Sequence, residues 1–177
     1  MRIRKAERED LPALLALYAE ARATIALLGI DQWQDGYPGE DAVLSDIEAG
    51  RGRVVEDEDG EIAGAFALCE GEDPTYRVIE NGSWMTSEPY LAMHRTAIRV
   101  KNRGTGVSGM IVRDAKESAR RLGLRTLRID THEGNVVMRR MLEKNGFEYR
   151  GVIHLLNGDP RVAYEILTGN TEREDEE

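Results

Sequence analysis

A strand, a glycine-rich turn and an amphipathic helix follow one another between residues 89 and 122, and this segment constrains the fold more than any other. We expect the strand over residues 89–100 and the helix over residues 106–122. The helix carries its apolar side chains on one stripe, which must pack against another layer of structure. That stripe consists of Val107, Met110, Ile111, Ala115, Ala119 and Leu122. The segment therefore predicts an α/β fold with this helix packed on a sheet.

Shorter helix and strand patterns surround this segment, and two polar, turn-rich stretches over residues 31–40 and 70–88 predict loops. The expected helices cover residues 10–23, 24–28, 41–49 and 135–144, and the expected strands cover residues 1–6, 53–56, 61–69, 126–130, 147–154 and 161–167. This order predicts a mixed, mostly antiparallel central sheet flanked by helices on both faces. We expect one domain over residues 1–170 and a disordered acidic tail over residues 171–177.

The charge and cysteine content argue against several classes of protein. Asp and Glu number 33 against 24 Lys and Arg, which gives a net charge of −9. This balance argues against a nucleic-acid partner and suits a cationic substrate. The single cysteine, Cys69, excludes an internal disulfide and is expected in the core, while three scattered histidines argue against a metal site. The sequence has neither an apolar run long enough for a membrane span nor a secretory signal, so we expect a cytoplasmic protein without membrane contact.

The glycine-rich turn is a candidate phosphate site. Its sequence over residues 98–109, IRVKNRGTGVSG, allows successive N–H groups and the positive end of a helix dipole to face an anion. A purely structural turn is one alternative. Another is a nicotinamide-dinucleotide enzyme, because Gly104-x-Gly106-x-x-Gly109 matches the dinucleotide fingerprint and Asp130 could hold a ribose. That fingerprint normally opens a domain, however, and here it lies in the second half. A P-loop is excluded because no Gly-Lys-Ser/Thr occurs.

Three blocks follow one another in order around this turn. The strand His94–Ile98 precedes the turn, the turn reads Arg103-Gly104-Thr105-Gly106-Val107-Ser108, and a later block runs from Asn135-Val-Val-Met138 to Lys144-Asn145-Gly146-Phe147. With these blocks, the stretch from Tyr90 to Val152 resembles the GNAT superfamily of N-acetyltransferases, which bind acetyl-CoA. Ser108 departs from the Gly or Ala of the family's Gln/Arg-x-x-Gly-x-Gly/Ala loop, but it is small and is expected to preserve binding. The resemblance implies the GNAT-like fold, acetyl-CoA as cosubstrate and no metal.

The resemblance also implies specific contacts to acetyl-CoA. The backbone of Ile98 and Val100 would pair with the pantetheine arm like an added strand, and a backbone N–H near Ile98 would polarise the thioester carbonyl. Asn135 would reach the same arm, although it is also a natural helix N-cap. The expected cofactor-binding residues are Ile98, Val100, Arg103, Gly104, Thr105, Gly106, Val107, Ser108 and Asn135.

The implied reaction needs a base, because a free alkyl amine has a pKa near roughly 10 and attacks only when it is neutral. Strand alternation predicts that residues 94, 96 and 98 share one face, which favours His94 as the base. Glu88, just before the strand, is the second candidate. The alternative for His94 is a partly buried histidine bonded to a carbonyl.

The usual general acid of the family is missing. Many members have a tyrosine seven residues after the motif asparagine, and that position is Leu142 here. Solvent, Tyr164 or Tyr149 could instead supply the proton to the departing thiolate. The thiol of coenzyme A, like free cysteine, should titrate near roughly 8.5, so the thiolate is already a fair leaving group.

Three aromatic residues in the two predicted loops, Trp33, Tyr37 and Trp84, could form the wall of an amine pocket or plug the edge of the core. The leading hypothesis is transfer of an acetyl group from acetyl-CoA to a primary amine of a small molecule or peptide. The alternative is a non-catalytic CoA-binding or regulatory module, because Ser108 and Leu142 depart from the family pattern. The sequence leaves the identity of the acceptor and the formation of a homodimer open.

Overall fold

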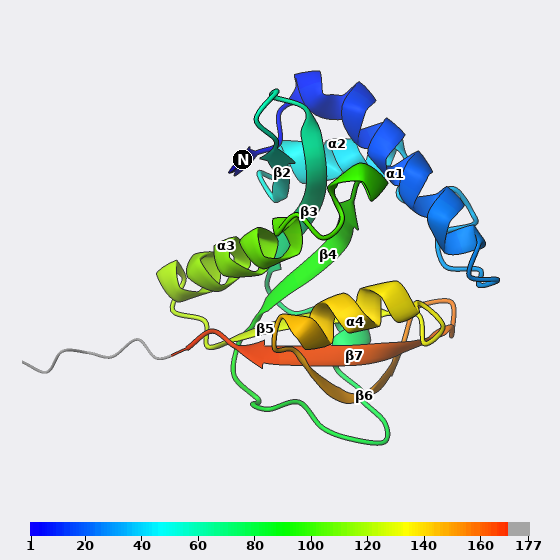
Figure 1. The fold of residues 1–177 in the computed structure, drawn as a ribbon. Coiled ribbons are helices and arrows are strands. Elements are labelled where there is room, and N and C mark those ends of the chain that lie inside the picture. Colours follow the sequence, from blue (N-terminus) through cyan, green and yellow to red (C-terminus); the bar gives the residue numbers. More distant parts are fainter. Residues whose placement is uncertain (170–177) are drawn as a thin grey trace, which may run out of the picture.

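Seven strands form one sheet in the order β1-β2-β3-β4-β5-β7-β6, and helices cover both of its faces (Figure 1). The computed structural model describes residues 1–169, so the tail predicted over residues 171–177 lies outside the described residues. The strands are β1 (Arg2–Lys5), β2 (Gly52–Glu56), β3 (Ile62–Glu70), β4 (Leu91–Ile98), β5 (Thr126–Thr131), β6 (Glu148–His154) and β7 (Pro160–Leu167). The helices are α1 (Leu11–Ala26), α2 (Glu40–Glu48), α3 (Val107–Arg121) and α4 (Val136–Lys144), with short 3-10 turns η1 (Arg8–Asp10), η2 (Pro74–Tyr76) and η3 (Val100–Asn102). The predicted order of elements and the mixed, mostly antiparallel sheet are confirmed.

The two faces of the sheet are covered by different helices. On one face, Ile111 of α3 and Leu142 of α4 are fully buried in the same apolar cluster as β4, β5 and β7. On the other face, Leu17 of α1 and Val43 of α2 pack over β2 and β3. Among residues 1–169, none of these helices combines the length and the apolarity needed to cross a membrane.

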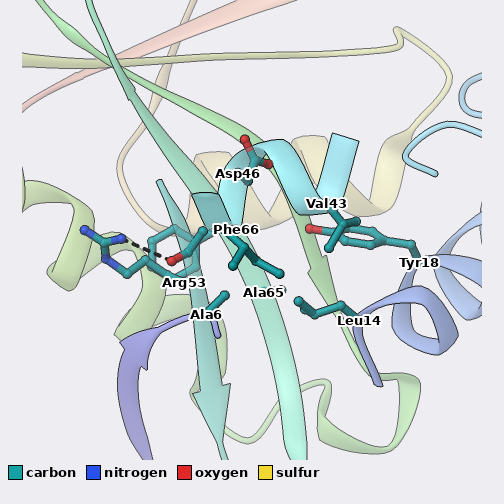
Figure 2. Close-up of a pocket in the computed structure, with 10 residues that line it drawn as sticks. Ala6, Leu14, Tyr18, Val43, Asp46, Arg53, Ala65 and Phe66 are labelled. Carbon is teal, nitrogen blue, oxygen red and sulfur yellow. Dashed lines mark hydrogen bonds between the residues drawn. The ribbon is translucent and has the colours of Figure 1, made fainter. Parts of the chain in front are cut away.

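The packing of α1 and α2 on the sheet leaves a void of only about 10 Å³, shown in Figure 2. Its walls are Ala6, Leu14, Tyr18, Val43, Asp46, Ile47, Gly52, Arg53, Ala65 and Phe66. A space of this size holds about one water molecule. This void is therefore too small for a larger ligand.

Strands β4 and β5 diverge after a short parallel pairing. They pair only at Leu91↔Leu127 and Ala92↔Arg128, although β4 continues to Ile98. Beyond Ala92, the edge of β4 that faces β5 has no partner strand in the described part of the chain (Figure 1). An open strand edge of this kind can accept an extended ligand as an added strand. We call this divergence the split between β4 and β5.

A β-bulge in β4 overturns one expectation about its side chains. Ala65 and Ala67 of β3 are two residues apart, but their partners in β4, Ala97 and His94, are three apart. The extra residue shifts the alternation, so the prediction that residues 94, 96 and 98 share a face is wrong. His94 and Ile98 point to opposite faces of the sheet, with His94 on the face that α1 and α2 cover.

Arg95 lies in this bulge with a φ of 51°, a left-handed value that is uncommon for a residue other than glycine. Its guanidinium makes two hydrogen bonds to the carboxylate of Asp46 on α2, one of them 2.7 Å long. It also donates to the hydroxyl of Tyr37 at 2.8 Å. Asp46 is only 6% exposed, so the bulge is held by a largely buried ion pair from a different element.

Two predicted element boundaries also differ from the structure. The separate helix predicted over residues 24–28 is wrong in that α1 runs unbroken to Ala26. Thr24 lies inside α1, and its hydroxyl donates to the carbonyl of Glu20, four residues earlier, at 3.0 Å. The strand predicted over residues 89–100 ends at Ile98, and Val100 begins the 3-10 turn η3.

The segment between β3 and β4 covers the second face of the C-terminal half of the sheet, where no helix lies in the described residues. It is irregular as predicted, apart from the turn η2. Beneath this segment, Arg128 of β5 and Glu165 of β7 form a buried ion pair 2.9 Å long. Arg128 donates to the carbonyl of Thr86 at 2.7 Å, and the rings of Trp84 and Tyr90 lie 4.3 and 3.9 Å from its guanidinium. These contacts fix the segment against the sheet beside the split.

Candidate active site

The turn between β4 and α3 presents a row of backbone N–H groups at the start of a helix. Gly104 and Gly106 have φ values of 78° and 92°, which favour glycine because a side chain would be strained there. Within the described chain, the N–H groups of Gly104 and of residues 106–109 donate to no protein acceptor. Free N–H groups at a helix N-terminus bind anions. The predicted loop therefore has the free N–H groups that a phosphate site needs.

Side chains around the turn add charge unevenly. Arg103 is exposed and forms no ion pair among the described residues, so its charge is available to an anion. Lys101 instead forms an ion pair, 2.5 Å long, with Glu61, the residue before β3. The hydroxyl of Ser108, at the position that departs from the family pattern, accepts a hydrogen bond of 3.4 Å from Asn145. Thr105 donates its hydroxyl to the carbonyl of Asn102 at 2.7 Å, which tightens the turn.

The two residues expected to pair with a pantetheine arm are placed differently. Ile98 is the last residue of β4 and pairs with Gly64 of β3 on one side. Val100 lies beyond the strand, and its N–H donates to the carboxylate of Glu20 on α1 at 2.6 Å. Glu20 also binds the guanidinium of Arg99 at 3.0 Å. Val100 could pair with a ligand through its N–H only if the contact with Glu20 opened.

Asn135 caps α4, as the sequence predicted. Its side-chain oxygen accepts from the N–H of Met138 at 3.1 Å, and its amide donates to Gln32 at 2.9 Å. Asn135 is 7% exposed. Its contact with a pantetheine arm stays a prediction.

His94 forms a pair with Asp73, which the sequence did not single out. The Nε2 atom of His94 lies 3.1 Å from Oδ2 of Asp73. The other oxygen of Asp73 accepts from the N–H and the hydroxyl of Thr75, at 2.9 and 2.7 Å. Burial alone would raise the pKa of Asp73, but the hydrogen bonds from His94 and Thr75 outweigh it and lower the pKa to about 2. A carboxylate fixed in this way orients the imidazole and leaves its Nδ1 atom for another partner.

Tyr76 and Asp130 form a second polar pair beside His94. The hydroxyl of Tyr76 donates to Oδ1 of Asp130 at 2.7 Å, and its ring centre lies 6.0 Å from that of His94. Burial and the neighbouring carboxylate raise the pKa of Tyr76 well above its usual value. Burial also raises the pKa of Asp130, while the charge of His94 and the hydrogen bond from Tyr76 act in the opposite direction.

These observations overturn the nicotinamide-dinucleotide hypothesis. The dinucleotide fingerprint belongs to parallel sheets, whereas the only parallel pairing among the described strands is the short one between β4 and β5. Asp130, the residue expected to hold a ribose, instead accepts the hydrogen bond from Tyr76.

A cleft of about 370 Å³ opens beside His94. Its walls are Tyr37, Ala42, Ser45, Asp46, Arg51, Cys69, Glu70, Gly71, Glu72, Asp73, Pro74, Ala92, His94 and Arg95. Carboxylates outnumber arginines among these residues, which suits a cationic ligand. Cys69, expected in the core, is half-buried in this wall, and burial raises the pKa of its thiol.

The other aromatic residues predicted to wall an amine pocket pack against protein instead. Trp33 lies edge-on to Tyr18 and to Tyr37, with ring centres 6.0 and 6.2 Å apart. Trp84 donates its indole N–H to the carbonyl of Tyr76 at 2.8 Å. Of the three predicted residues, Tyr37 is the one that lines the cleft.

The remaining candidates for proton transfer lie outside the cleft. Glu88 is exposed and pairs with Arg125 at 3.5 Å. The hydroxyl of Tyr164 accepts from Arg139 at 3.0 Å and donates to Glu143 at 3.1 Å, both on α4. Tyr149 lies edge-on against the Tyr164 ring, and Leu142 is fully buried in the core.

Sequence reasoning missed Asp46, Asp73 and the pairing of Tyr76 with Asp130. The stretch Asp73-Pro74-Thr75 does carry a local signal, since an N-cap residue followed by proline predicts a helical turn. That signal places the turn but does not indicate that it lies against His94.

Comparisons with known proteins agree with this architecture. The sequence model of the acetyltransferase (GNAT) family matches residues 11–147. The solved structure of a GNAT-family acetyltransferase from Streptococcus agalactiae 2603 has a TM-score of 0.87 at 34% identity, over 96% of each chain. No curated protein matches the sequence.

Two further solved structures are similar at lower identity, and these likenesses concern the fold alone. A GNAT-family acetyltransferase from Listeria monocytogenes 4b F2365 has a TM-score of 0.70 at 21% identity, over 94% of each chain. A ribosomal-protein-alanine N-acetyltransferase from Brucella melitensis has a TM-score of 0.65 at 19% identity, over 94% of this chain and 99% of that one.

Proposed function

The chain belongs to the GNAT family of acetyltransferases, and on that premise we propose that it moves an acetyl group from acetyl-CoA to a primary amine of a small molecule or peptide by direct attack. One observation carries the proposal. The anion site at the start of α3 and the His94–Asp73 pair lie along the same strand, β4, whose edge toward β5 is open between them.

Acetyl-CoA fits the residues at the first of these places. The free N–H groups of Gly104 and residues 106–109, with the charge of Arg103, match the pyrophosphate. The open edge of β4 beyond Ala92 offers backbone groups to the amides of the pantetheine arm. Acetyl-CoA supplies the acetyl group as a thioester.

His94 acts as the base in this proposal. At neutral pH only about one alkyl amine in a thousand is neutral, since its pKa is near roughly 10. His94, held through Nε2 by Asp73, takes a proton from the acceptor and makes its lone pair available. Asp73 acts through His94 and is a positioning residue.

The proton balance does not require a tyrosine at position 142. The amine nitrogen bonds to the thioester carbon, the C–S bond breaks, and its electron pair stays on sulfur. The nitrogen loses two protons from its ammonium form. One goes to His94, and the other is released to solvent, which protonates the departing thiolate. A buried Leu142 is compatible with this transfer.

The test is release of free thiol from acetyl-CoA in the presence of a panel of alkyl amines, amino acids and peptides, with the acetylated product identified by mass. We expect release that depends on an amine. Binding of acetyl-CoA without turnover of any amine would instead favour the non-catalytic CoA-binding module.

A further inference from the structure

Asp130 and His94 occupy equivalent places on the two strands of the split. Ala92 and Arg128 are the last paired residues of β4 and β5, and His94 and Asp130 follow each of them by two positions. Alternation in each strand keeps these side chains on one face, and the bulge begins only after His94. The imidazole and the carboxylate thus lie on the two strands that flank the split, on one face of the sheet, and His94 also lines the cleft described above.

The carboxylate of Asp130 has one oxygen fixed and one available. Oδ1 accepts the hydroxyl of Tyr76, which is only 2% exposed. Oδ2 has no hydrogen-bond partner among the described residues, and Asp130 is half-buried rather than enclosed. The titratable and charged groups that face Asp130 are His94, Asp73, Tyr76 and, from β7, Arg161. In the described chain, no cationic side chain forms an ion pair with the carboxylate of Asp130.

We propose that Asp130, held in place by Tyr76, binds the ammonium form of the acceptor amine beside His94, so that the site takes acceptors that arrive as cations. The inference rests on the proposed acetyl transfer, and it specifies that the acceptor amine binds in its ammonium form. Asp130 is then a catalytic residue in the sense that it touches the substrate.

The chemistry of the acceptor explains why a second carboxylate is useful there. An alkyl amine arrives almost entirely protonated, so the site must first hold a cation and then remove its proton. An N–H of the ammonium group donates to Oδ2 of Asp130, and another N–H passes its proton to the free nitrogen of His94. Asp130 remains ionised throughout, and the resulting imidazolium lies between it and Asp73.

The buried hydroxyl of Tyr76 gives the carboxylate a fixed direction. A carboxylate with both oxygens solvated would rotate and be screened, whereas a charge-assisted contact to a fixed oxygen is stronger. The same arrangement disfavours acceptors with an anionic group next to the amine, because two carboxylates already flank His94.

A test that needs no turnover is titration of the protein with n-butylammonium chloride, without any acetyl donor, followed by NMR of the histidine rings. The chain has only three histidines, so a His94→Gln spectrum assigns the His94 signal. We expect the His94 signal of the wild-type protein to shift saturably with n-butylammonium and not with n-butanol, the neutral counterpart.

Asp130→Asn removes the charge while its side-chain carbonyl can still accept from Tyr76. We expect it to weaken n-butylammonium binding by about tenfold or more, as for the loss of a charge-assisted hydrogen bond. Asp59→Asn, in the exposed turn between β2 and β3, removes the same charge elsewhere and should leave binding unchanged.

Two outcomes would overturn the inference. One is equal binding of n-butylammonium by the wild-type protein and Asp130→Asn. The other is no shift of the wild-type His94 signal at about 100 mM, where even a contact of millimolar affinity would be saturated. Because no acetyl donor is present, either result is independent of whether the protein transfers acetyl groups.

Discussion

The two ends of the open edge of β4 are built in different ways. The candidate anion site consists of backbone N–H groups from one short stretch of chain, those of Gly104 and residues 106–109, which donate to no acceptor in the described residues. The cluster around His94 consists of half-buried or buried side chains from the segment between β3 and β4, from β4 and from β5, and these are already bonded in two pairs. A backbone site tolerates changes of side chain, which fits Ser108 in place of Gly or Ala. A side-chain cluster depends on each of its members.

The largest effect is expected where a single side chain has no substitute. His94→Ala should lower kcat by about 10²- to 10⁴-fold, the usual contribution of a positioned base, with little change in acetyl-CoA affinity. His154→Ala, exposed on β6, is the matched control and should be neutral. The measurement is turnover across the pH range together with acetyl-CoA binding. A normal rate for His94→Ala would move the role of base to Glu88 or water.

The next largest effect tests how the side-chain cluster is held. Asp46→Ala leaves Arg95 without its partner in the bulge and should lower the free energy of unfolding by about 3 kcal/mol, as for the loss of one partner of a buried ion pair. Turnover should fall with it, because Asp46 and Arg95 form part of the cleft wall beside His94. Glu48→Ala, which breaks the exposed pair with Arg8, should cost less than about 1 kcal/mol.

Denaturant titration of both variants, with kcat measured in parallel, checks this prediction. Equal stability losses for Asp46→Ala and Glu48→Ala would show that the pair does not hold the bulge.

A smaller effect is expected from the pH dependence of the His94–Asp73 pair. The folded state lowers the pKa of Asp73 from 3.8 to about 2, so its stabilising contribution is complete above about pH 4 and is lost as the pH falls through about 2. A shift of this size corresponds to about 2 kcal/mol. The difference in unfolding free energy between the wild-type protein and Asp73→Asn should shrink by that amount between about pH 5 and about pH 2. A difference that did not change with pH would contradict the pairing.

The contrast between the two ends also explains what the sequence could predict. The glycine turn, α3 and the cap at Asn135 depend on residues within a few positions of one another, and all three were predicted correctly. The bulge at Arg95 depends on Asp46 and Tyr37, which belong to distant segments, so strand alternation gave the wrong face for Ile98.

The side-chain cluster was out of reach for the same reason. Asp73 and Tyr76 lie in an irregular stretch without periodicity, and their partners His94 and Asp130 come from two different strands. The separate helix predicted over residues 24–28 was wrong because α1 continues to Ala26.

The central claim is that the glycine turn holds acetyl-CoA, and the most direct measurement is thermal unfolding with and without acetyl-CoA. At about 100 times its dissociation constant, acetyl-CoA should stabilise the wild-type protein by roughly 2.7 kcal/mol. Gly106→Glu places a side chain and a negative charge where φ is 92° and the N–H groups face the anion, and it should lose this stabilisation. Gly60→Glu, with a φ of 80° in a distant turn, carries the same strain and should keep it. Stabilisation by acetyl-CoA that is equal in Gly106→Glu and Gly60→Glu, or absent from the wild-type protein, would contradict the account.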